Sequence, residues 1–180
     1  MLCNLIPDAA CVVLCAAAAF TDVRTRRIPN ALTLPAIPVG FALSFILYAR
    51  TGLQDGFAEG LLPSLFGAAF LFGAFALFYA ARGVGAGDVK LMAAVGSFLR
   101  WPAAIWALAF VLFAGAFAAL VYATATGQIA DVARNMAKSV QRRLGRSVGE
   151  VNLTPHTMPY GPAILLGATA TVLFRYRYLL

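Results

Sequence analysis

Four stretches of this 180-residue chain contain no charged side chain, and each is long enough to cross a lipid bilayer. They cover residues 28–49, 60–81, 101–130 and 151–174. A membrane-spanning helix needs about 20 mostly apolar residues. Ala, Gly, Leu and Phe dominate these stretches and do not alternate with a period of two, so helices fit them and a transmembrane barrel does not.

The composition agrees, with 62% hydrophobic and only 12% charged residues and a mean hydropathy of +0.83. Soluble domains carry about 25% charged residues. Two shorter apolar segments, residues 9–21 and 89–99, add two helices. We therefore predict an all-α, polytopic membrane protein, a single domain made of a bundle of about six transmembrane helices. The expected spans are residues 5-21, 31-49, 61-80, 87-100, 103-123 and 160-175.

The basic residues predict an orientation for this bundle. The loops after the first, third and fifth expected spans hold ten of the fourteen Lys and Arg residues, and the opposite side holds four. The positive-inside rule places the richer side in the cytoplasm, so we expect both termini to be periplasmic.

Much of the net charge of +7 lies in one expected cytoplasmic loop, residues 127-150. Its basic residues recur at helical spacing, which suits a short amphipathic helix on the anionic lipids of the inner leaflet. Ordinary charge that sets the topology explains them equally well. Neither explanation needs a nucleic-acid partner.

Two of the seven acidic residues stand apart from the rest. The other five are expected at the outer surface or in the basic loop: Asp8, Asp55, Glu59, Asp131 and Glu150. Asp22 is expected to end the first span and Asp88 to open the fourth, both at the cytoplasmic boundary. No charged residue is expected on a helix in the outer half of the membrane.

An ionisable group near the membrane core indicates a functional site. Two adjacent carboxylates cannot both ionise easily, so one keeps a proton while the other acts as a base. Such a pair, Asp22 and Asp88, could activate a water and protonate a peptide carbonyl oxygen, with no metal or cofactor. Helix capping is the alternative for either aspartate taken alone.

The residues around Asp88 suit a close approach by another chain. Gly83, Gly85 and Gly87 allow unusual backbone torsions and tight packing. Lys90 could bind an acidic substrate residue or a lipid phosphate, or it could simply extend its amine to the membrane surface. The three cysteines form no CxxC pair, so no metal site is expected.

Three segments together resemble one known family. They are "DVRTRRIPN" (22–30), "GAGDVKL" (85–91) and "PYGPAI" (159–164). In this order and topology the chain resembles the type IV prepilin peptidases, polytopic inner-membrane aspartic proteases of the GxGD type. The resemblance covers nearly the whole chain.

The resemblance implies that Asp22 and Asp88 are the catalytic pair and that Gly85 and Gly87 form the backbone turn of the motif. It suggests that Asn30 helps to frame the active site, although helix capping would also explain this residue. Tyr160 could close the catalytic cleft or belong to a rigid turn. The implied substrate is a prepilin, whose short basic leader is removed at the cytoplasmic face of the inner membrane.

One departure from the larger family members is informative. They carry a cytoplasmic insertion with paired CxxC motifs and an N-methyltransferase activity, whereas only about twenty residues precede Asp22 here. We therefore expect peptidase activity alone, as in the enzymes of tight-adherence (Flp-type) pilus systems, on a Flp-like prepilin. The alternatives are a small transporter or channel with paired membrane carboxylates, and a non-catalytic pilus assembly component.

Overall fold

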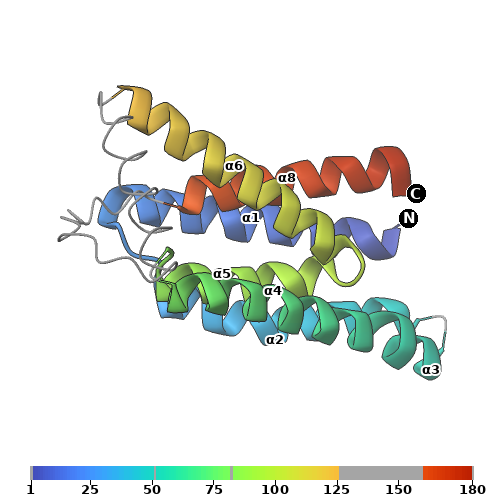
Figure 1. Ribbon diagram of the computed structural model, residues 1–180. Coiled ribbons are helices and arrows are strands. Elements are labelled where there is room, and N and C mark those ends of the chain that lie inside the picture. Colours follow the sequence, from blue (N-terminus) through green and yellow to red (C-terminus); the bar gives the residue numbers. More distant parts are fainter. Residues whose placement is uncertain (1, 51, 82, 126–159, 180) are drawn as a thin grey trace, which may run out of the picture. The chain divides into compact units, whose positions relative to one another are not determined.

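A computed structural model describes residues 2–50, 52–81, 83–125 and 160–179, and within them every regular element is helical (Figure 1). In chain order these are α1 (Leu2–Thr25), α2 (Asn30–Tyr48), α3 (Leu53–Asp55), the π-helical segment η1 (Gly56–Leu61), α4 (Leu62–Ala80), α5 (Ala86–Leu99), α6 (Ala103–Ala125), α8 (Gly161–Phe174) and the π-helical segment η2 (Arg175–Leu179). The chain divides into two compact units. The first holds residues 1–115 and 159–180, and the second, residues 116–158, contains the last part of α6. The expected basic loop, 127-150, lies outside the described residues.

The helices lie close to the expected spans but several extend beyond them. α1 continues to Thr25, so Asp22 lies inside its last turns instead of ending it. The third long helix begins at Gly56, because η1 runs directly into α4. Pro35 and Pro38 both lie within α2, as the sequence places them.

Within the described ranges, four helices are long and apolar enough to cross a membrane by themselves. They run over Asn4–Thr25, Asn30–Tyr48, Gly56–Ala80 and Ala103–Val121. Large apolar side chains point outward from them, with Val13 69%, Phe66 64% and Leu77 74% exposed. Exposing so much apolar surface to water would be energetically unfavourable, whereas apolar lipid tails can cover it. The protein is therefore a multi-pass membrane protein.

The first unit is built around α5, whose residues 91–100 are all buried. α5 is only 14 residues long, about 21 Å at 1.5 Å per residue. It packs most closely on α4, where a side chain on Gly96 would collide with the backbone of Gly67. Across the core, Cys11, Cys15 and other apolar residues of α1 face α5 and α8.

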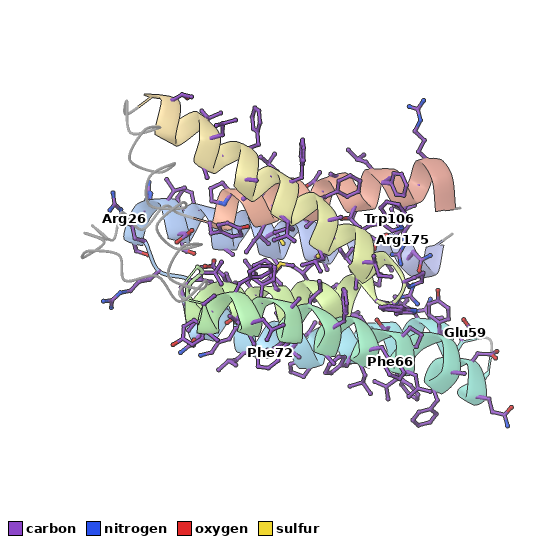
Figure 2. The ribbon with its side chains drawn as sticks, viewed as in Figure 1. Arg26, Glu59, Phe66, Phe72, Trp106 and Arg175 are labelled. Carbon is purple, nitrogen blue, oxygen red and sulfur yellow. The ribbon has the colours of Figure 1, made fainter. Side chains whose placement is uncertain are left out.

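Within the first unit, successive long helices run in alternate directions. In Figure 1, α1 lies beside α8, and the start of α1 is at the same end as the end of η2. Arg26, after α1, lies at one end of the bundle, and Glu59 and Arg175 lie at the other (Figure 2). The end of α1 and the start of α5, which carry the candidate aspartates, are at the Arg26 end.

A buried ion pair at the Arg175 end corrects the expectation that Asp8 is a surface residue. Asp8 is 1% exposed, and its Oδ1 accepts a hydrogen bond of 2.7 Å from Nη1 of Arg175. Arg175 also donates to the main-chain oxygen of Leu99 over 2.8 Å, so it joins α1, α5 and α8. Charged residues are therefore buried on helices in the half of the bundle away from Asp22, contrary to the sequence expectation.

That ion pair does not extend toward Asp22 as a polar path. Asp8 and Asp22 are fourteen residues apart on α1, about 21 Å along the helix. Between them, the buried face of α1 consists of Cys11, Leu14, Cys15 and Ala18, which pack into the apolar core.

Candidate functional site

Asp22 and Asp88 line the same pocket, although 66 positions separate them in the sequence. The pocket has a volume of about 290 Å³ and lies among the end of α1, the following loop and the start of α5. Both aspartates are buried, with 7% and 8% of their surface exposed. α1 and α5 pack against each other, and this packing brings the two carboxylates to one site.

The first turn of α5 fixes Asp88. Oδ2 of Asp88 accepts a hydrogen bond of 3.0 Å from the main-chain N–H of Gly85, the residue that precedes the helix. A carboxylate in the first turn is also stabilised by the positive end of the helix dipole. The capping interaction considered for Asp88 is therefore present, and the same side chain still lines the pocket.

The start of α8 fixes Asp22 in a similar way. Oδ2 of Asp22 accepts a hydrogen bond of 2.8 Å from the main-chain N–H of Gly161. A Cβ atom at Gly161 would lie 3.0 Å from the Cα of Ala19 and 3.0 Å from the Cβ and Oδ2 of Asp22. Nothing in the sequence marks Gly161 as a site residue, because no pattern in a single sequence reports a main-chain contact across 139 residues.

Within the described residues, each carboxylate uses one oxygen in a hydrogen bond and leaves the second without a partner. Among the described residues, Oδ1 of Asp22 and Oδ1 of Asp88 have no hydrogen-bond partner, and neither is a fully buried unsatisfied atom. A carboxylate oxygen that lies at a pocket wall and has no hydrogen-bond partner can bind a water or a ligand. Each aspartate thus has one anchored oxygen and one available oxygen.

Some of the other candidate residues line this pocket and others lie outside its lining. Gly85 and Gly87 line it directly. Lys90 and Asn30 do not line it, but they are joined by a hydrogen bond of 2.9 Å from Nζ of Lys90 to Oδ1 of Asn30. Asn30 does not cap α2, whose N-cap is Pro29 and has no side-chain cap. The pair instead ties the start of α2 to the first turns of α5.

Tyr160 directly precedes α8 and does not line the pocket. Its ring meets the ring of Phe75 in an edge-on contact with centroids 6.2 Å apart. Its hydroxyl occupies the space left by Gly115, where any side chain would collide with it. This contact holds the turn that carries Gly161, as a rigid turn would require.

Two arginines that were not expected as site residues, Arg26 and Arg27, also line the pocket. Arg26 and Arg27 follow α1 and are exposed, and Arg26 has a positive φ of 52°. Together with the aspartates they give the pocket both acidic and basic walls. In the described part of the chain, no three His, Cys, Asp or Glu residues gather where they could hold a metal ion.

The fold and the site define a class: a multi-pass helical membrane protein with two buried carboxylates in one pocket at the end of the bundle. The sequence model of the type IV leader peptidase family matches residues 9–124, nearly two thirds of the chain. The chain therefore belongs to the type IV leader peptidase family.

Individual relatives agree with this family. Over 132 residues the chain is 31% identical to a prepilin leader peptidase/N-methyltransferase of Myxococcus xanthus, covering 69% of this chain and 37% of the relative. A protein of the same description from Burkholderia pseudomallei is 28% identical over 167 residues, covering 91% of this chain and 44% of the relative. The chain thus spans less than half the length of these curated relatives. No solved structure matches it significantly.

Proposed function

We propose that this chain is a membrane-embedded aspartic endopeptidase that removes the leader of prepilin-like precursors. The observation that carries the proposal is the single pocket lined by Asp22 and Asp88, each with one free carboxylate oxygen. The family supports the reaction class, since the two relatives above are described as prepilin leader peptidases.

The chemistry needs only the two carboxylates, a water and a peptide bond. The ionised aspartate takes a proton from the water, whose oxygen attacks the peptide carbonyl carbon. The protonated aspartate donates to the carbonyl oxygen, which carries the developing negative charge. When the tetrahedral intermediate collapses, the C–N bond breaks, the leaving amine takes a proton from the first aspartate, and one hydroxyl of the intermediate returns a proton to the second aspartate as the C=O bond reforms. The shared proton is thereby restored to the pair.

The hydrogen bonds from Gly85 and Gly161 have a defined part in this scheme. Each holds Oδ2 of one aspartate, so Oδ1 of each is directed to the reacting water or carbonyl. Placement of this kind can account for a large part of a rate enhancement, because a misplacement of 1 Å can cost about 10²-fold. Gly85 and Gly161 are positioning residues in this proposal, and Lys90 and Asn30 shape the rim beside it.

Co-expression of a candidate precursor with the protein tests the proposal. We expect Asp22→Asn and Asp88→Asn each to abolish maturation, measured as the shift of the precursor to its shorter form. Asp55→Asn, an exposed acidic residue of α3, is the matched control and should leave maturation at the normal rate. Normal maturation by either site variant would rule out the carboxylate pair. An intact precursor with wild-type protein would favour a non-catalytic assembly component.

We further propose that the chain has no N-methyltransferase activity and prefers a Flp-like prepilin. The absence of a CxxC pair from the sequence supports the lack of N-methyltransferase activity, and Cys11 and Cys15 are instead buried in the core. The preference for a Flp-like prepilin rests on the resemblance to the tight-adherence enzymes. Supplying labelled S-adenosylmethionine with either a Flp-like or a longer prepilin tests both points. Label in the mature product, or faster cleavage of the longer prepilin, would contradict them.

We also propose that the pocket opens toward the cytoplasm, with both termini periplasmic and the protein in the bacterial inner membrane. The support is the basic residues near the pocket, among them Arg24, Arg26, Arg27 and Lys90, which the positive-inside rule places in the cytoplasm.

A further inference from the structure

A second pocket lies at the end of the bundle opposite to the aspartates. It has a volume of about 260 Å³, and its walls include Asn4, Tyr48, Arg100, Trp101 and Arg175. Asn4 precedes Asp22 by eighteen residues on α1, which is about 27 Å along the helix. That length is close to the roughly 30 Å thickness of the hydrocarbon core, so this pocket is at the other face of the membrane.

Arg100, the C-cap of α5, has a backbone conformation that normally excludes any residue other than glycine. Its φ is 61° and its ψ is 170°. A non-glycine residue held in this region costs of the order of 1–3 kcal/mol. Glycine is also the residue that most often follows the end of a helix. The presence of arginine at this position indicates that its side chain has a use that offsets the cost.

The side chain of Arg100 is held within the bundle by neutral groups. The residue is 5% exposed. Its Nη1 donates to the main-chain oxygen of Glu59 over 3.0 Å, and its Nη2 donates to Oδ1 of Asn4. The guanidinium carbon lies 4.5 Å from the centre of the Tyr48 ring. Nε is buried and has no partner among the described residues.

Arg100 therefore differs from its neighbour Arg175, which is paired with Asp8. In the described part of the chain, no carboxylate forms an ion pair with Arg100. Glu59 also lines the pocket, but the residue is exposed and is not in salt-bridge contact with Arg100. Asp8 attracts Arg100 electrostatically but is already bound by Arg175, so Arg100 makes no salt bridge of its own within the described residues. A buried cation in this state is costly, so an anion is expected to enter the pocket.

We propose that this pocket binds a phosphate group through Arg100. Guanidinium groups bind phosphate oxygens with strong, directional hydrogen bonds. The pocket lies at the depth where phospholipid phosphates are found, and Trp101, which is 45% exposed, marks that depth as aromatic residues commonly do. The phosphate can come from an anionic phospholipid headgroup or from a soluble phosphate. This site is independent of the proposed peptidase reaction.

The test uses the purified full-length chain in detergent, stripped of lipid. Phosphatidylglycerol, diacylglycerol with the same tails, and inorganic phosphate are added separately. Native mass spectrometry gives the fraction of protein with lipid bound, and thermal unfolding gives the stabilisation. We expect wild-type protein to bind phosphatidylglycerol at least about tenfold more tightly than diacylglycerol, because only the former carries the phosphate. Stabilisation by inorganic phosphate alone would identify a soluble phosphate as the ligand.

Three variants connect this binding to Arg100. Arg100→Gly should lose the preference for phosphatidylglycerol and any response to inorganic phosphate, while it folds well, because glycine accepts the backbone conformation without strain. Arg100→Gln keeps the bulk of the side chain and should lose the same responses. Arg50→Gln removes a charge from an exposed residue after α2 and should behave as wild type. Unchanged phosphate selectivity in Arg100→Gly, or no selectivity in the wild type, would overturn the proposal.

Discussion

The main-chain N–H of Gly161 donates a hydrogen bond of 2.8 Å to Oδ2 of Asp22, across 139 residues of sequence. Because α8 begins at Gly161, the position of the whole helix is linked to the orientation of this one carboxylate. Asp88 has a matching donor in Gly85. The two aspartates are thus oriented by the starts of two different helices.

Gly161→Ala should lower the rate of precursor cleavage by about 10²-fold with little change in KM, because a displaced Asp22 impairs the reaction more than substrate binding. The added Cβ would lie 3.0 Å from both Asp22 and Ala19, so one of them must move. Cleavage kinetics with purified protein measure this effect. Gly73→Ala is the control, since a Cβ there meets nothing within 4 Å. Equal kcat values for the two variants would refute the positioning role.

Asp88→Asn and Asp88→Ala should separate helix capping from catalysis. The asparagine retains an oxygen that can accept the hydrogen bond from Gly85, so the variant should unfold at nearly the wild-type temperature while losing cleavage. The alanine loses the acceptor as well, and its free energy of unfolding should fall by about a further 1 kcal/mol. Thermal unfolding in detergent, beside the cleavage assay, measures both effects. A fully active asparagine variant would mean that Asp88 serves the helix alone.

Breaking the buried ion pair between Asp8 and Arg175 should destabilise the protein strongly. Removing either partner leaves a buried charge unpaired, at a cost of about 3 kcal/mol or more. The double variant Asp8→Leu/Arg175→Met should recover much of that loss, because neither charge remains. Unfolding in mixed micelles gives the three free energies for a double-mutant cycle. Strictly additive losses would show that the two side chains do not stabilise each other.

Gly96→Ala should destabilise the contact between α4 and α5 by about 1–3 kcal/mol, because its Cβ would collide with the backbone of Gly67. The same change at Gly73 should have the opposite sign and stabilise α4 by about 0.5–1 kcal/mol, since alanine favours helix and meets no neighbour there. The two free energies of unfolding test this pair of predictions. Equal effects would contradict the close packing of α4 on α5.

Cysteine labelling tests the proposed orientation. In a background without the native cysteines, Gln54→Cys should react with a membrane-impermeant reagent in intact spheroplasts, because this exposed residue is at the expected periplasmic end. Arg26→Cys, exposed at the other end, should react only after the membrane is permeabilised. The reverse pattern would place the Asp22 and Asp88 pocket in the periplasm.

The class of the protein and the order of its helices follow from the amino-acid sequence. Long uncharged runs in a chain with few charges permit only membrane-spanning helices, since a bilayer offers no partners to an open backbone. The same scarcity of charge made Asp22 and Asp88 conspicuous. The expectation that Asp8 lies at the surface is wrong for a related reason. A carboxylate near a chain end resembles a surface residue until its partner is known. That partner, Arg175, lies 167 residues away.

The tertiary structure alone decided which groups meet. The pocket that contains both aspartates depends on α1 packing against α5, and hydrophobic periodicity shows which residues are apolar but not which helices are neighbours. The hydrogen bond from Gly161 and the conformation of Arg100 are properties of the main chain, which no side-chain pattern encodes. Contacts of this kind form only when distant segments fold together, and for that reason they could not be read from the order of the residues.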